Sequence, residues 1–228
     1  MTMGLADRII QWERRTREYY NVDPAIPGNE RRARIYNLYF DHAILRGIWT
    51  NFHQVAPGVY RSNHPTHDRF EQMRDQGITT VLNLRGAGNG AHYLSEKASC
   101  EALGITLIST TLHARAAATR AELLALIDIF QTIDKPFVMH CKSGADRAGL
   151  ASAIWLLVME GKPVAEAAKM LSWRFWHFRN RKVGILDYIL DCYGARNTRD
   201  PISFRDWVAA EYDHLDITER FKARKAPA

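Results

Sequence analysis

The stretch FVMHCKSGADRAG occupies residues 137–149 and decides the fold. Its first three residues, FVM, are apolar, and His140 follows them. This run begins after Pro136 and predicts a short buried strand at 137–140. The residues from Arg147 to Glu160 are largely apolar, stop at Gly161, and predict a helix. Cys141 therefore stands at the end of a strand, and Arg147 stands at the start of a helix, with a tight turn between them.

A turn of this kind suits an anion with the geometry of phosphate. A helix N-terminus aims backbone N–H groups at one point, with the positive end of the helix dipole behind them. Gly144 allows the chain to curl closely around the anion, and Arg147 offers a rigid fork of donors to two oxygens. The same field favours the thiolate of Cys141, which is the nucleophile for in-line attack on phosphorus. We expect His140 to brace the turn, and Ser143 and Ala145 to line it with Gly144.

Strand and helix patterns alternate on the N-terminal side of this turn. Strands are predicted at 55–61 (broken by Pro57 and Gly58), 78–84 and 105–110, and helices at 68–76, 93–103 and 119–133. Thr119 with Glu122 three residues later forms a capping-box pattern. Strands separated by helices predict an α/β fold, with a central, mainly parallel sheet of about four to five strands and helices on both faces.

Composition agrees with a folded protein that binds anions. The chain has 228 residues, 46% hydrophobic and 25% charged, and a formal net charge of +6. Excess positive charge favours anionic partners, although a solvated basic face explains it equally well. The three cysteines at 100, 141 and 192 form neither a disulfide framework nor a metal-binding pattern, which predicts a reducing compartment. No signal sequence or spanning helix is expected, so we place the protein in the cytoplasm and leave a peripheral contact with the inner membrane open.

The turn resembles the signature of the protein tyrosine phosphatase superfamily, which is His-Cys, five residues, then Arg. HCKSGADRAG is similar to the compact dual-specificity branch in its bacterial form, and the segments APGVYRSNHP (56–65) and TTVLNLRG (79–86) resemble its upstream strands. The resemblance covers about 52–193. It implies phosphoryl transfer to Cys141, hydrolysis of the phosphocysteine by water, and no metal or organic cofactor.

Two positions depart from the family pattern. The loop that commonly carries an aspartic general acid should lie near 111–119, and TLHARAAAT contains no Asp or Glu. We therefore expect Asp146, directly before Arg147, to be the acid, as in myotubularin-type phosphatases. The alternatives are that His113 is the acid, or that Asp146 only pairs with a nearby cation or caps the helix. Ala148 replaces the usual Ser or Thr after the arginine, which leaves the second step dependent on Ser143.

Substrate signals lie in Lys142 and in the segment WRFWHFRNRK (173–182), which has four cations, four aromatic residues and no acid. Such a segment suits a membrane interface or, less well, a nucleic acid; it equally suits a helical core with surface cations. We expect Arg179 and Lys182 to contact the substrate. Lys142 either adds a further positive contact with the substrate or faces solvent. These features favour a lipid phosphate of the phosphatidylglycerophosphate or lipid A type over phosphotyrosine protein, with a phosphate-binding pseudophosphatase as the third alternative.

The expected organisation has three parts. Residues 1–51 form a helical extension with helices at 5–20 and 31–48, residues 52–195 form the catalytic domain, and residues 196–228 form a second helical extension. The sequence leaves the oligomeric state and the task of the first fifty residues open.

Overall fold

The computed structural model describes residues 5–46, 48–180 and 182–224. The short ends of the two predicted extensions, Gly47 and Arg181 lie outside the described residues. The five strands are β1 His53–Ala56, β2 Val59–Ser62, β3 Thr80–Asn83, β4 Thr106–Ser109 and β5 Phe137–His140.

These strands form one sheet in the order β1-β2-β5-β3-β4. β1 and β2 form an antiparallel hairpin around Pro57 and Gly58, and the other neighbours are parallel. The central strands β3 and β5 are buried along their whole length, as expected of β-branched and apolar runs covered on both faces. The predicted α/β fold with a mainly parallel five-stranded sheet is confirmed.

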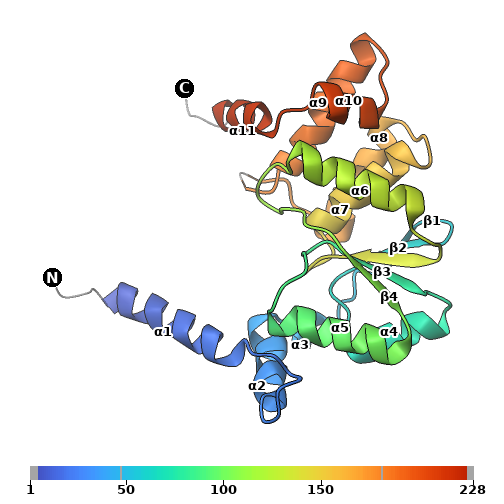
Figure 1. Ribbon diagram of the computed structural model, residues 1–228. Coiled ribbons are helices and arrows are strands. Elements are labelled where there is room, and N and C mark those ends of the chain that lie inside the picture. The colour runs from blue at the N-terminus through green and yellow to red at the C-terminus, as the bar shows by residue number, and fades with distance from the viewer. Residues whose placement is uncertain (1–4, 47, 181, 225–228) are drawn as a thin grey trace.

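Helices cover both faces of the sheet (Figure 1). On one face lie α4 (His67–Asp75) and α5 (Ala91–Leu103); on the other lie α6 (Arg120–Thr132) and α7 (Asp146–Val158). α6 begins with the predicted capping box, in which Thr119 and Glu122 exchange hydrogen bonds. The apolar α7 is buried along most of its length between the sheet and the helices that follow it.

The C-terminal helices belong to the larger of the two main cores. After α8 (Val164–Ala167) and the 3₁₀ turns Ala168–Met170 and Trp173–Phe175, the chain forms α9 (Ile185–Arg199), α10 (Phe204–Ala210) and α11 (His214–Ala223). Phe204, Trp207 and Tyr212 pack into the same hydrophobic cluster as α6 and α7. α9 runs through residue 195, so the proposed boundary there falls inside a helix.

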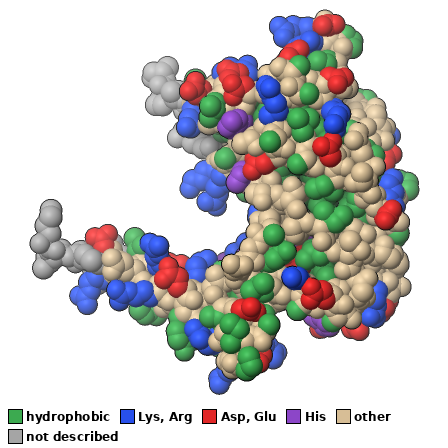
Figure 2. All heavy atoms as spheres, in the orientation of Figure 1, with side chains coloured by type: hydrophobic (Ala, Val, Ile, Leu, Met, Phe, Trp, Pro, Cys, Tyr) green, Lys and Arg blue, Asp and Glu red, His purple; other side chains and the backbone are tan. Residues whose placement is uncertain are grey.

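The N-terminal part differs from the continuous helix predicted at 31–48. It contains α2 (Glu30–Ile35), a π-helical turn Tyr36–Phe40 and α3 (Ala43–Arg46). The prediction of one helix is wrong because His42 adopts φ 62° and turns the chain; this brings Asp41 and Arg46 into the interior. α1 (Leu5–Tyr20) projects away from the body, and a hollow separates it from the C-terminal helices (Figure 2).

Candidate active site

The turn after β5 lies where the parallel strands end. Ser62 and Asn83, the last residues of β2 and β3, both pair with His140. In open α/β sheets this edge is where ligands bind. The chain passes from Cys141 through Gly144, which has φ +73°, into the first turn of α7. A Cβ at Gly144 would lie 2.7 Å from the backbone N of Asn63, so only glycine allows this approach.

Arg61 braces the turn from behind. Its side chain is fully buried on β2, and its guanidinium donates to the carbonyl oxygens of Gly144 (2.6 Å) and Ala145 (3.1 Å). A third hydrogen bond reaches Met170 O at 2.8 Å, and the Phe175 ring lies 4.1 Å from the guanidinium carbon. Burial lowers the pKa of Arg61 to about 10, and it remains a cation at neutral pH. Because its carbonyls are held from behind, the turn is free to aim N–H groups toward an anion.

The turn runs from Cys141, the expected nucleophile, to Arg147, the expected phosphate-binding fork. Cys141 directly follows β5 and has 1% of its surface exposed. Arg147 is half-buried in the first turn of α7, and its Nε is among the buried donors without a hydrogen-bond partner in the described part of the chain. It lines a cavity of about 370 Å³ with residues 112–116. A guanidinium that lines a cavity and has a donor without a partner is available to bind an anion.

Asp146 is joined to two residues that the sequence reading did not select. Its Oδ1 lies 2.8 Å from His177 Nδ1, and the other ring nitrogen of His177 lies 2.9 Å from Asp187 Oδ2. Burial alone would lower the pKa of His177, but the hydrogen bonds to the two carboxylates raise it to about 9. Asp146 is therefore paired with a nearby cation, one of the alternatives that the sequence left open, and this pairing connects the turn to the start of α9. Its role as the acid stays a prediction.

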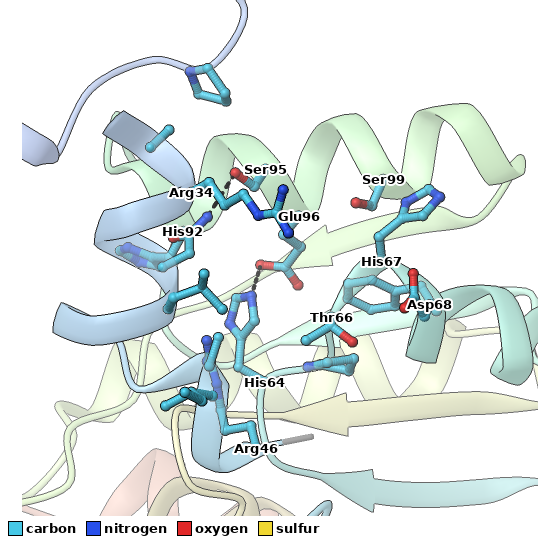
Figure 3. Close-up of a pocket in the computed structure, with 18 of the residues that line it drawn as sticks. Arg34, Arg46, His64, Thr66, His67, Asp68, His92, Ser95, Glu96 and Ser99 are labelled. Atoms are coloured by element: carbon cyan, nitrogen blue, oxygen red, sulfur yellow. Dashed lines mark hydrogen bonds and ion pairs between the residues drawn. The ribbon is translucent and has the colours of Figure 1, made fainter. Parts of the chain in front are cut away.

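His140 is braced by a buried carboxylate. Its Nε2 lies 2.5 Å from Glu96 Oε1 on α5, and both side chains are fully buried. Its Nδ1 lies 3.4 Å from Cys141 O, and the bracing role expected of His140 stays a prediction. Glu96 also borders a second cavity, of about 680 Å³, between α4, α5 and the N-terminal helices, where Arg46, His64 and His92 also lie (Figure 3).

His64, Glu96 and His140 are close enough together to suggest a metal site. The hydrogen bonds argue against it. Arg85 lies 2.9 Å from His64 Nδ1 and can only donate, which leaves the proton of this imidazole on Nε2, the atom that faces Glu96. Burial lowers the pKa of His64 well below its usual range. The cluster therefore offers a cation too few free lone pairs, and its geometry is that of a hydrogen-bonded brace.

Lys142 points toward the N-terminal extension. Its Nζ lies 3.5 Å from Phe40 O and 3.6 Å from Asp41 Oδ1. Asp41 also binds Arg85 and Arg46, at 2.8 and 2.9 Å. Burial alone would raise the pKa of Asp41, but these three cations lower it to about 2. Three cations around one carboxylate leave the flank of the turn positive.

The first fifty residues thus gain a structural task. Phe40 and Asp41 contact the turn through Lys142. Asn51 contacts it as well, because its side-chain amide donates to Ser143 O (3.2 Å), and the same amide donates to Phe175 O (3.0 Å). Asn63 donates to Trp49 O, and Ser62 to Thr50 O. The chain before β1 therefore packs against the turn that follows β5, at residues 142 and 143.

The loop at 111–119 closes the small cavity beside Arg147. His113, the alternative acid, lines this cavity, and its Nε2 lies 3.2 Å from Glu122 Oε1. Arg115 lines it as well. Burial would raise the pKa of Glu122, but hydrogen bonds from Thr119 and His113 lower it. His113 is half-exposed at the rim, and it stays the alternative to Asp146.

The aromatic segment after α8 is divided between core and surface. Phe175 and His177 point inward, whereas Trp173, Trp176 and Phe178 are 79%, 58% and 57% exposed. Trp176 lies 5.1 Å from Trp49 and 6.3 Å from Phe178, ring centre to ring centre. We call Trp49, Trp173, Trp176 and Phe178 the aromatic rim.

Arg179 and Lys182, the expected substrate contacts, lie beyond this rim. Arg179 is exposed and forms an ion pair with Asp191 at 2.5 Å. Lys182 is exposed, and its backbone N–H donates to Asn180 Oδ1. Neither residue lines the cavity beside Arg147. Their contact with substrate stays a prediction.

Several residues of the site were missed from the sequence. They are Arg61, Asn51, Glu96, His177 and Asp187. Arg61 did carry a signal, since a cation inside the strand pattern 55–61 is unusual without a buried partner. The others come from distant segments that only the fold brings together.

Comparison with known proteins gives the family. Residues 55–162 match the family model described as "Polymorphic toxin system, DSP-PTPase phosphatase". The matched segment, just under half of the chain, is similar to the dual-specificity phosphatases of the protein tyrosine phosphatase superfamily. The phosphatase is thus a phosphoric monoester hydrolase that depends on a cysteine, as its signature predicts. No curated protein matches the sequence.

Solved structures share its fold. TpbA of P. aeruginosa is 22% identical, with a TM-score of 0.50, covering 64% of this chain and 91% of that one. A mutant form of Tk-PTP is 16% identical, with a TM-score of 0.52 and coverage of 65% and 97%. The catalytic core of Siw14 is 15% identical, with a TM-score of 0.50 and coverage of 66% and 91%. Across the described residues, the phosphatase has no helix long and apolar enough to cross a membrane.

Proposed function

We propose that the phosphatase hydrolyses phosphomonoesters of lipids through a phosphocysteine on Cys141. The thiolate attacks phosphorus in line, the S–P bond forms, and the electrons of the breaking P–O bond pass to the leaving oxygen. Asp146 donates the proton that this oxygen needs. Water then attacks the phosphocysteine and gives a proton to the Asp146 carboxylate, and Cys141 leaves as a thiolate.

The charges around the turn support this sequence of steps. Arg147 has a buried donor ready for the phosphoryl oxygens, and the N-terminus of α7 carries no side-chain cap that would compete for its N–H groups. Arg61 holds the carbonyl oxygens of Gly144 and Ala145 in the interior, behind the turn. Donors that are held in place before the reaction stabilise charge as it develops, at little cost in reorganisation.

The aromatic rim supports a lipid substrate, and it is the observation that carries this choice. The rings of Trp173, Trp176 and Phe178 are exposed, and that of Trp49 is half-buried in contact with Trp176. The backbone oxygen of Trp49 accepts a hydrogen bond from Asn63, whose backbone adjoins Gly144, so this rim lies near the turn. Exposed aromatic rings in contact with one another, as in Trp176 and Phe178, are rare on a surface that meets only water. Indole rings favour the headgroup level of a membrane, and the neighbouring Arg174 and Arg179 would meet anionic headgroups there.

The test compares one phosphoryl group in two settings. The protein is assayed on phosphatidylglycerophosphate in vesicles and on a short-chain, water-soluble analogue of the same lipid, with a phosphotyrosine peptide as a third substrate. We expect kcat/KM to be highest on vesicles. Trp173→Ala with Trp176→Ala should reduce the vesicle rate by about tenfold for each ring removed, as loss of buried aromatic area predicts. The rate on the short-chain analogue should hardly change.

Other outcomes would choose between the alternatives. If the peptide is the best substrate and the rim variants hydrolyse vesicles normally, the lipid assignment is wrong, and the protein is a protein phosphatase. If the protein binds phosphate but turns over neither lipids, peptides nor p-nitrophenyl phosphate, it is a pseudophosphatase.

A further inference from the structure

His177 is an almost fully enclosed charged group next to the turn. Its side chain is 1% exposed and lies between two carboxylates, with Asp146 on α7 at 2.8 Å and Asp187 on α9 at 2.9 Å. A carboxylate oxygen can only accept, so both ring nitrogens donate, and the ring is an imidazolium. Two short, charge-assisted hydrogen bonds fix the orientation of this ring.

The backbone is shaped to place His177 inward. The preceding residue, Trp176, has φ +60°, a conformation that costs free energy for a bulky residue. The turn points the Trp176 ring outward and the His177 ring into the protein, where the His177 N–H also donates to Ser172 O at 3.1 Å. The contacts of His177 with the two carboxylates offset the cost of this turn.

Asp187 balances the positive charge that His177 places beside Asp146. An imidazolium alone would favour the ionised form of Asp146, and an ionised carboxylate cannot donate a proton. Asp187 places a negative charge on the far side of the same ring, so Asp146 faces a pair with no net charge. Arg61, whose charge also acts on Asp146, donates from its two Nη atoms to the turn carbonyls and to Met170 O.

We propose that His177, neutralised by Asp187, is a positioning residue for the acid step of this phosphatase. It holds Oδ1 of Asp146 and so leaves the second carboxyl oxygen of Asp146 for the leaving group above Cys141 and Arg147. The proton passes from that oxygen to the leaving oxygen as the P–O bond breaks and the S–P bond forms. His177 keeps both of its protons throughout. The inference rests on the proposed hydrolysis, although it does not depend on the lipid nature of the substrate.

The test uses two soluble substrates that differ in their need for an acid. p-Nitrophenyl phosphate has a good leaving group, and phenyl phosphate has a poor one. We expect His177→Ala to lower kcat on phenyl phosphate by up to about a hundredfold, the effect of a small misplacement of a catalytic group, and on p-nitrophenyl phosphate by less than about threefold. His177→Asn keeps a donor near the position of Nδ1 and should recover most of the loss. His214→Ala, a histidine on α11, is the control that should match wild type.

A second measurement is independent of turnover. The His177 ring is titrated by NMR in wild type and in Asp146→Asn, and its pKa should fall in the variant because one of its two carboxylates is gone. An unchanged pKa would overturn the proposal. So would equal slowing of both aryl phosphates by His177→Ala in a wild-type background that hydrolyses them well. If wild type hydrolyses neither, the proposed function itself fails, and this inference fails with it.

Discussion

Replacing His177 with Asn should change how the stability of the phosphatase depends on pH. The pKa of His177 is raised from 6.5 to about 9 in the folded protein by its hydrogen bonds to Asp146 and Asp187. A group whose pKa is higher in the folded state binds its proton more tightly there. Its contribution to stability is therefore complete below pH 6.5 and disappears as the pH rises through 9.

The size of this effect follows from the two pKa values. Each pH unit between them corresponds to about 1.4 kcal/mol, so the interval from 6.5 to about 9 corresponds to about 3 kcal/mol of unfolding free energy. His177 is almost fully buried, so solvent screens its ion pairs little. The expected loss is a large part of the stability of a typical domain.

The assay is urea unfolding followed by tryptophan fluorescence, at several pH values from below 6.5 to above 9. Wild type should lose about 3 kcal/mol more than His177→Asn across this range. Thiols and other groups that titrate there are shared by both proteins and cancel in the difference. Parallel curves for wild type and variant would refute the reasoning, because they would show that His177 binds its proton no more tightly in the folded state.

Three further predictions concern the residues that shape the turn. Gly144→Ala should destabilise the protein by about 1–3 kcal/mol, because the residue has a positive φ and its new Cβ would meet the main chain; thermal unfolding measures this, and an unchanged melting temperature would contradict it. Arg61→Lys replaces the fork that binds the carbonyls of Gly144, Ala145 and Met170 with a single ammonium group, which cannot reproduce that arrangement, so kcat should fall by roughly tenfold or more while circular dichroism stays native; full activity would show that the brace is dispensable. Glu96→Gln removes the charge that holds His140, and the alkylation rate of Cys141 by iodoacetamide should change; an unaltered rate would separate Glu96 from the nucleophile.

Much of the fold could be predicted because its signals are local. The strand 137–140 ends where its apolar run ends, and α6 begins where Thr119 and Glu122 form their capping box. The helix expected at 31–48 was wrong for an equally local reason: helical periodicity gives no sign that His42 would take a left-handed conformation and end it. The structure gives a reason for the turn at His42: it lets the neighbouring Asp41 form ion pairs with Arg85 and Arg46 in the interior.

The candidate site could likewise be predicted where its residues are neighbours in the sequence, and not where they are distant. The positions of Cys141 and Arg147 follow from one contiguous motif whose chemistry depends on spacing. The residues that support them come from far along the chain: His140 meets Glu96, and Asp146 meets His177. Such contacts depend on how helices pack across the end of the sheet. The sequence pattern of aromatic residues and cations around His177 suggested a surface, whereas the fold turned this one side chain inward.

The most direct test of the account is to trap the phosphoryl group on the enzyme. The protein is mixed with p-nitrophenyl phosphate, quenched in acid during turnover, digested, and analysed by mass spectrometry. The account predicts one added phosphoryl group on the peptide that contains Cys141, and neither adduct nor turnover in Cys141→Ser. Turnover that persists in Cys141→Ser, or a phosphoryl group found on another residue, would contradict it.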